Sequence, residues 1–202
     1  MPRPRLVSDV DVFAAFDASI AAHGPNGVTL AIVAQRLGIT APALMRRFGS
    51  KQGLFSAFML HELAAQPTTL GALLAQHPNP LDAVLALSGE TREYTVNRKA
   101  YLRHLASCFL QLADDDALGP IIGRWFTRER RWIAKRLDEA RTRRELKSGL
   151  PVADLARTLQ AALHGARLQW ALGGAGAEGT WSARELDAVL TPWRCHPRRF
   201  HP

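Results

Sequence analysis

Apolar residues recur every three or four positions along most of this chain, in segments separated by short stretches rich in glycine, proline and polar residues. This spacing predicts amphipathic helices, and no run of alternating β-branched residues bounded by turns predicts a strand. The expected fold class is therefore all-α. Helices are expected near residues 9–23, 30–37, 41–47, 50–65, 69–76, 80–98, 100–113, 121–147, 151–172 and 183–194.

Residues 29–51, with the sequence TLAIVAQRLGITAPALMRRFGSK, form the most informative stretch. Thr29 stands where the N-cap of a first short helix is expected, and Gly38 can take the left-handed conformation that ends it. Thr40 is the next possible N-cap, and Pro42 follows in the first turn, where a missing amide proton costs little. Two short helices joined by a tight turn indicate a helix-turn-helix, and a hairpin within an ordinary helical bundle is the alternative.

The second of these helices has one buried stripe, formed by Leu44 and Phe48, so its other faces should be exposed. Those faces carry Ala41, Ala43, Met45, Arg46 and Arg47. Small residues let a backbone approach base edges in a major groove, and arginines reach guanine or phosphate. Lys51 lies in the first turn of the next helix, where we expect a phosphate contact, with a solvated lysine as the alternative.

These residues also carry a family resemblance. The sequence LGIT at 37–40, followed by Leu44, Arg46, Phe48 and Ser50–Lys51 at fixed spacing, resembles the TetR family of transcriptional repressors over roughly residues 8–62. Met45 stands where the family usually has tyrosine, so Arg46 or Arg47 is expected to carry more of the attachment to the DNA backbone. Together, the pattern and the resemblance imply DNA contacts at Thr29, Thr40, Ala41, Pro42, Ala43, Met45, Arg46, Arg47 and Lys51.

The resemblance implies two domains, a helix-turn-helix DNA-binding domain at residues 1–50 and a helical ligand-binding and dimerisation domain at 51–202. The helix expected at 50–65 would enter both. Displacement of its far end would change the separation of two DNA-binding heads, as an effector-controlled repressor requires. A rigid connector without a switching role is the alternative.

The last two expected helices resemble the pair that dimerises TetR-family proteins. Ser182 and Glu185 have the spacing of a capping box at the start of the final helix. The predicted dimer interface consists of Leu155, Leu159, Leu163, Ala166, Leu186, Val189, Leu190 and Trp193. A two-fold homodimer would place two recognition helices about one DNA turn apart and would bind a palindromic operator. The alternative for the same apolar stripes is the core of a single chain.

Aromatic and weakly polar residues in the middle of the chain are of the kind that line apolar ligand pockets. The predicted binding residues for a small-molecule effector are His61, Tyr94, Tyr101, His104, Cys108, Trp125 and Trp170. The alternative for each of them is ordinary core packing, since buried aromatic side chains are common.

The net charge of +8 suits a polyanionic partner, but most of the excess lies outside the helix-turn-helix. Residues 124–147 contain ten basic and four acidic side chains, a net charge of +6. We interpret this cluster as the solvated face of a long helix. A second function class follows from it, a protein-interaction module whose basic helix at 121–147 docks an acidic partner.

The sequence contains no phosphate loop, nucleophile elbow or metal-binding spacing, so neither catalysis, nor a cofactor, nor a metal site is expected. Two cysteines are too few for a disulfide framework, and no segment reaches the length of an apolar membrane span. The expected protein is a cytoplasmic, homodimeric regulator of transcription that binds double-stranded DNA and a small-molecule effector.

Overall fold

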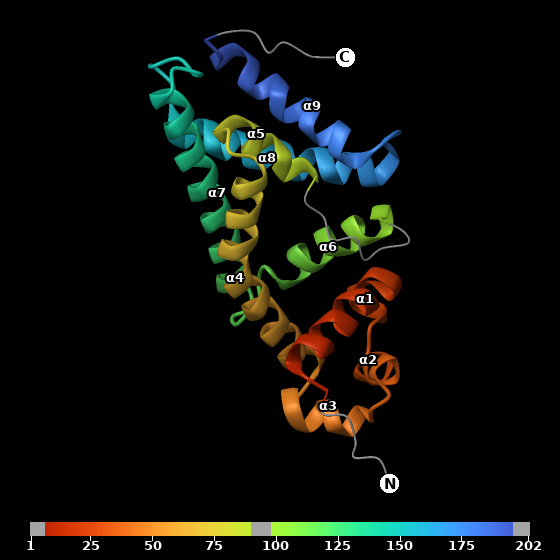
Figure 1. Cartoon of the computed structure of the whole chain (residues 1–202). Helices are drawn as coiled ribbons and strands as arrows, with labels where there is room; N and C mark the ends of the chain where they lie inside the picture. The colour runs from red at the N-terminus through yellow and green to blue at the C-terminus, as the bar shows by residue number, and fades with distance from the viewer. Residues whose placement is uncertain (1–6, 90–97, 196–202) are drawn as a thin grey trace. The chain divides into compact units, whose positions relative to one another are not determined.

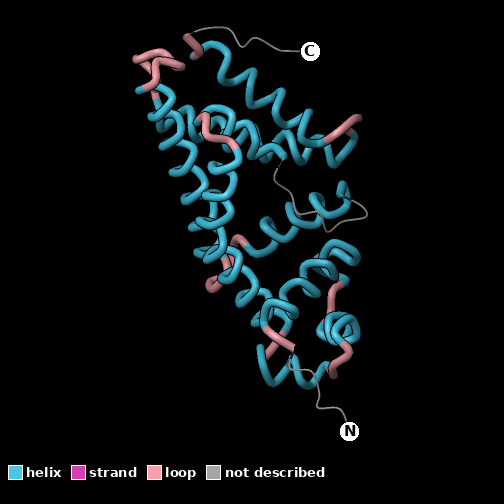
Figure 2. Tube along the Cα trace, viewed as in Figure 1, coloured by secondary structure: helices cyan, strands magenta, loops and turns pink. Residues whose placement is uncertain are grey.

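The computed structural model describes residues 7–89 and 98–195 and confirms the all-α class (Figure 1). Within these residues the chain consists of helices and connecting loops, without a strand (Figure 2). The helices are α1 Asp9–Gly27, α2 Leu30–Leu37, α3 Ala41–Phe48, α4 Lys51–Gln76, α5 Pro80–Ala86, α6 Arg98–Leu112, α7 Gly119–Thr142, α8 Val152–Gly173 and α9 Glu178–Leu190, with 3-10 turns η1 at Leu87–Gly89 and η2 at Thr191–Trp193. Among the residues described, no helix combines the length and apolarity that a membrane span requires.

The chain divides into two compact units. Unit 1 contains the described parts of Met1–Ala64 and Glu93–Ile122, and unit 2 contains those of Ala65–Arg92 and Gly123–Pro202. The predicted domain boundary at residue 50 separates α3 from α4. The boundary between the two units instead lies inside α4, and α6 belongs to the same unit as the helix-turn-helix. Both α4 and α7 begin in unit 1 and continue into unit 2.

Unit 1 is held together by the packing of α1 against α2 and α6. A capping box starts α1, because the Ser8 hydroxyl accepts from the Asp11 amide at 3.2 Å and the Asp11 carboxylate accepts from the Ser8 amide at 3.0 Å. Edge-to-face rings join α1 to α4, with the Phe16 ring centroid 5.6 Å from those of both Phe55 and Phe58. This aromatic cluster fixes α1 on the front half of α4.

Unit 2 has a separate apolar core contributed by α4, α5, α7, α8 and α9. Its fully buried side chains include Ile133 and Leu137 of α7, Leu159 and Leu163 of α8, and Leu190 of α9. Helices α8 and α9 run side by side (Figure 1). The regular i, i+3 and i, i+4 spacing of these leucines therefore serves packing within this unit.

Three predicted helix boundaries were wrong for tertiary reasons. Helix α4 runs through Pro67, merging the segments expected at 50–65 and 69–76, because buried Leu63, Leu70 and Leu73 on both sides favour a continuous helix. Helix α9 begins at Glu178, so Ser182 is a buried residue inside the helix and not its cap. The segment expected as one helix at 80–98 contains α5 and η1, and its residues 90–97 lie outside the described residues.

Candidate nucleic-acid interface

The turn between α2 and α3 has the predicted geometry. The Thr29 hydroxyl accepts from the Ile32 amide at 3.3 Å and so caps α2. Gly38 ends α2 with φ 65° and ψ 27°, a left-handed conformation that favours glycine, and the Ile39 amide bonds back to the Ala34 carbonyl at 3.1 Å. These local contacts confirm the helix-turn-helix expected from residues 29–51.

One buried side chain anchors α3, and the rest of the helix remains accessible. Leu44 has 0% exposure and packs into the core of unit 1. Thr40 has the extended backbone of an N-cap, but its hydroxyl makes no capping hydrogen bond. The predicted contact residues Thr29, Thr40, Pro42, Met45, Arg46, Arg47 and Lys51 are exposed, while Ala41 and Ala43 are half-buried. The face predicted for DNA is thus open to solvent within unit 1.

Arg47 is held by residues at the start of α1. Its Nη1 donates to the Val7 carbonyl at 2.8 Å, and its guanidinium forms an ion pair with the Asp9 carboxylate. The guanidinium also lies 5.4 Å from the centroid of the Phe48 ring. Because an exposed ion pair is worth only about 0–1 kcal/mol, a DNA phosphate could displace Asp9 at small cost. The pairing of Asp9 with Arg47 was not predicted from the sequence.

Lys51 and Arg46 differ from Arg47 in carrying no ion pair with any residue described. Lys51 Nζ donates to the Pro25 carbonyl at 3.1 Å, a neutral acceptor that leaves the lysine charge uncompensated. Arg46 is exposed, and within the part of the chain that the structure describes it makes neither a hydrogen bond nor an ion pair. Met45, which stands where the resemblance implies tyrosine, therefore has as its neighbour an arginine that is available for a phosphate.

Gly53 positions α3 against α4, a role that the sequence analysis did not identify. A Cβ at this position would lie 2.0 Å from the Phe48 carbonyl oxygen, so only glycine allows the end of α3 to approach the first turn of α4 this closely. The Gly53 amide donates to the Ser50 hydroxyl at 2.9 Å, so Ser50 caps α4. A glycine in the first turn of a helix, where other residues are more favourable, could have indicated this close approach from the sequence.

The predicted effector residues are divided between the two units. His61, Tyr101, His104 and Cys108 belong to unit 1, Trp125 and Trp170 to unit 2, and Tyr94 lies outside the described residues. His104 Nδ1 lies 3.1 Å from the Ile20 carbonyl, and the indole of Trp170 donates to the Gly176 carbonyl at 3.0 Å. Both side chains therefore have structural contacts, and their role in effector binding stays a prediction.

Cys108 is a buried thiol in unit 1 with 1% exposure. Burial, followed by the negative charge of Asp17, raises the pKa of this thiol from 9.0 to about 12. A thiol with so high a pKa remains protonated and weakly nucleophilic at neutral pH. Cys195, by contrast, is exposed, and both cysteines are free.

The predicted dimer residues lie mostly in the interior of a single protomer. Leu155, Leu159, Leu163, Ala166, Leu186 and Leu190 are buried, and Val189 and Trp193 are half-buried against the same core. Burial favours the intramolecular alternative for the six buried side chains, whereas the half-buried Val189 and Trp193 keep some surface that a partner could contact, so their role in a dimer stays a prediction.

Unit 2 contains a buried polar network that the sequence analysis did not predict. Glu129, with 7% exposure, accepts from Gln160 Nε2 at 2.7 Å and lies 2.8 Å from His164 Nε2. Burial alone would raise the pKa of the Glu129 carboxyl, but the hydrogen bond and positive charge of His164, the hydrogen bond of Gln160 and the charge of Arg167 together hold that pKa below 4.5. An ionised carboxylate therefore joins α7 to α8.

Comparison with known sequences matches residues 14–58 to the family described as "Bacterial regulatory proteins, tetR family". This match covers α2, α3, most of α1 and the front of α4. The comparison with curated proteins found no match.

Several solved structures share the fold over nearly their whole length. A TetR-family transcriptional regulator from Cytophaga hutchinsonii is 13% identical, with a TM-score of 0.76, covering 94% of this chain and 96% of its own. A TetR transcription regulator from Haloarcula marismortui is 13% identical, with a TM-score of 0.74 and coverage of 92% and 97%. A transcriptional regulator from Rhodococcus sp. Rha1 is 21% identical, with a TM-score of 0.72 and coverage of 94% and 100%. At sequence identities this low, the structural similarity establishes the fold alone.

Proposed function

Because residues 14–58 make this chain a member of the TetR family of bacterial regulatory proteins, we propose that it is a repressor that binds a palindromic operator as a homodimer. A small molecule bound by the helical part of the chain would release it from DNA. The protein would act in the cytoplasm as a non-enzymatic regulator. The observation that carries the proposal is the exposed face of α3, anchored from behind by Leu44.

The chemistry of this face suits a major groove. The half-buried Ala41 and Ala43 keep the front of α3 narrow, so that its backbone can approach base edges and thymine methyl groups. Arg46 and Lys51 would neutralise phosphates. Met45 lacks the hydroxyl of the tyrosine usual at this position in the family, so it would offer the DNA an apolar contact. Few side-chain hydrogen bonds to bases are available, so phosphate attachment and DNA shape should contribute much of the affinity.

An exposed stripe on α8 is the surface that we propose for the homodimer. Ala161, Gly165, Leu168 and Leu172 follow one another at spacings of four, three and four, and therefore share one helix face. Leu168 is 38% and Leu172 is 69% exposed, unusual for large apolar side chains. The small residues at 161 and 165 would let a partner helix approach closely. This stripe replaces the buried residues that the sequence analysis named.

The DNA proposal is tested by selecting bound sequences from a random duplex pool and measuring affinity by fluorescence anisotropy across a salt series. A palindrome is expected. Arg46→Ala should weaken binding by about tenfold and reduce the salt slope by about one charge. Arg47→Ala should cost less, because that side chain is already paired with Asp9. Arg143→Ala, an exposed change far along the sequence, is the control.

The alternative function is a protein-interaction module whose basic helix at 121–147 docks an acidic partner. It predicts that changes in α7 weaken binding and that Arg46→Ala does not. If duplex binding is absent, or is lost through changes in α7 and not through Arg46, the repressor proposal fails. The dimer surface is tested separately by sedimentation of Leu172→Glu beside the control Leu110→Glu, since Leu110 is also exposed, at 77%. Only Leu172→Glu should yield monomers.

A further inference from the structure

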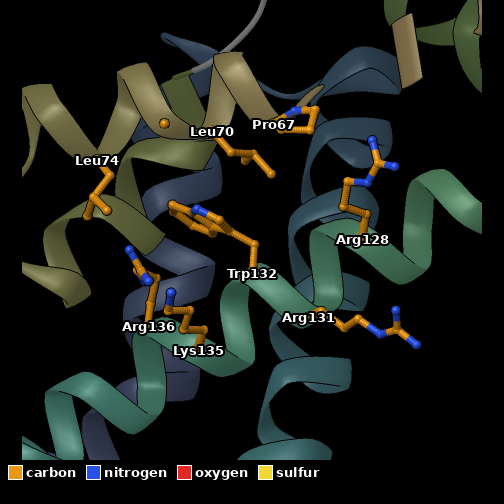
Figure 3. Close-up of a pocket in the computed structure, with 9 residues that line it drawn as sticks. Pro67, Leu70, Leu74, Arg128, Arg131, Trp132, Lys135 and Arg136 are labelled. Carbon is orange, nitrogen blue, oxygen red and sulfur yellow. The ribbon is translucent and has the colours of Figure 1, made fainter. Parts of the chain in front are cut away.

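An open groove in unit 2 lies between the back half of α4 and the middle of α7 (Figure 3). Its volume is about 420 Å³. Pro67, Leu70 and Leu74 line it from α4, and the indole of Trp132 projects from α7 toward Leu70. This groove contains none of the residues that the sequence predicted for effector binding.

The α7 side of the groove is strongly cationic. Arg128, Arg131, Lys135 and Arg136 all line it, with no acidic residue among the lining side chains. Arg136 is paired with Glu139 at 2.7 Å and also lies 5.5 Å from the Trp132 ring. Arg131 and Lys135 are exposed, and neither has an ion-pair partner within residues 7–89 and 98–195.

Of the three acidic residues of the same helix, Glu139 is the partner of Arg136, and the other two are engaged away from the groove. Glu129 points to α8 and bonds to Gln160, and Asp138 pairs with Arg141 at 2.7 Å. Positive charge is thus left along one edge of the groove. An anion placed there would gain from Arg131 and Lys135 without first displacing an internal carboxylate.

The rest of the groove is apolar and short. Gly71 lies on its α4 side, and a Cβ added there would meet nothing within 4 Å. From Pro67 to Leu74 the helix rises by about 10 Å. The volume falls within the usual range for small-molecule sites, whereas a stable protein partner needs roughly 800 Å² of surface on each side. These dimensions favour a small ligand.

We propose that this groove binds a small anionic amphiphile, with its charged head at Lys135 on the cationic α7 edge that Arg131 extends, and its alkyl chain against Leu70 and Trp132. The recognised chemistry is one anionic head, carboxylate or phosphate, joined to a medium-length chain. Binding itself is independent of DNA. Its role as the signal that releases DNA rests on the proposed function, because α4 and α7 both extend from this groove into unit 1.

Binding is tested with decanoate below its micelle concentration, by calorimetry and tryptophan fluorescence on the full chain. Decanol and decyltrimethylammonium carry the same chain with neutral and cationic heads and should bind at least about tenfold more weakly. Decyl phosphate should bind comparably to decanoate. Equal binding of decanol, or no saturable binding of decanoate and decyl phosphate, would overturn the proposal.

Two variants locate the site. Gly71→Leu fills the groove from a position with free space and should weaken decanoate binding at least about tenfold, while Gly123→Leu, also in open helical space, should leave it unchanged. Arg131→Gln with Lys135→Gln should have a similar effect to Gly71→Leu. The matched charge control is Arg124→Gln with Arg143→Gln. Binding that is unaffected by Gly71→Leu would place the ligand elsewhere and refute the assignment.

Two further measurements separate other outcomes. Flotation with phosphatidylglycerol vesicles, without decanoate binding, would show a membrane surface site and contradict the small-ligand proposal. Operator affinity is measured with and without decanoate. Decanoate that binds in a Gly71-dependent way but leaves DNA affinity unchanged would uphold the groove and refute only its coupling to DNA release.

Discussion

Replacing Gly53 by alanine should loosen the junction between α3 and α4. The added Cβ would lie 2.0 Å from the Phe48 carbonyl oxygen, where ordinary contact begins at 3.4 Å, so the two segments must separate by up to about 1.4 Å. Overpacking of this kind costs about 1–3 kcal/mol, against a gain of at most about 1 kcal/mol from helix propensity. With the full gain taken, the net change should be a loss of up to about 2 kcal/mol.

The matched variant is Gly123→Ala, in a helix but with nothing within 4 Å of the new Cβ. It should stabilise the protein by about 0.5–1 kcal/mol, the usual difference between glycine and alanine in a helix. Urea unfolding is followed by far-UV circular dichroism, because both units are helical and all five tryptophans belong to unit 2, whereas Gly53 belongs to unit 1. Hydrogen exchange in α3 and α4 locates the effect.

Since Gly53 sets the position of α3, the same substitution should weaken the proposed operator binding even at temperatures where the chain remains folded. If Gly53→Ala stabilises the protein as much as Gly123→Ala, the close approach of Phe48 to Gly53 is not a constraint and the reasoning is refuted. Unchanged DNA affinity in a destabilised variant would limit the role of Gly53 to folding.

Two predictions concern pH. Burial and Asp17 raise the pKa of the Cys108 thiol to about 12, whereas the thiol of the unfolded chain has a pKa near 9.0. The unfolded state therefore loses the proton first, and the free energy of unfolding falls as pH rises from 9.0 to about 12. Urea unfolding of Cys108→Ala should show a shallower fall over this pH range, and an identical fall would contradict the raised pKa. The pKa of the Glu129 carboxyl is held below 4.5, so its stabilising effect is present above pH 4.5 and is lost as pH falls through the pKa of the folded state. In equilibrium unfolding, Glu129→Gln should lower the free energy of unfolding at neutral pH by about 1.5–3 kcal/mol and reduce its dependence on pH in the acid range. An unchanged pH dependence in the acid range would count against the network with His164.

Local sequence determined the helix-turn-helix. The caps at Ser8 and Thr29 and the left-handed turn at Gly38 depend on contacts between residues three to five apart, so they can be inferred from residue type and spacing. The exposure of the α3 residues follows from one anchor, Leu44, and the period of the helix. The all-α class follows from the same periodicity.

Only the tertiary structure decided which surface each apolar stripe covers. Leu159 and Leu190 could pack equally well, by pattern, within one protomer or between two, and burial in the core of unit 2 assigns them to the former. The pairing of Arg47 with Asp9 and the opposition of α4 to α7 in the cationic groove join residues tens of positions apart. Periodicity specifies which side chains share a helix face, but the neighbour of that face depends on how distant segments of the chain fold together.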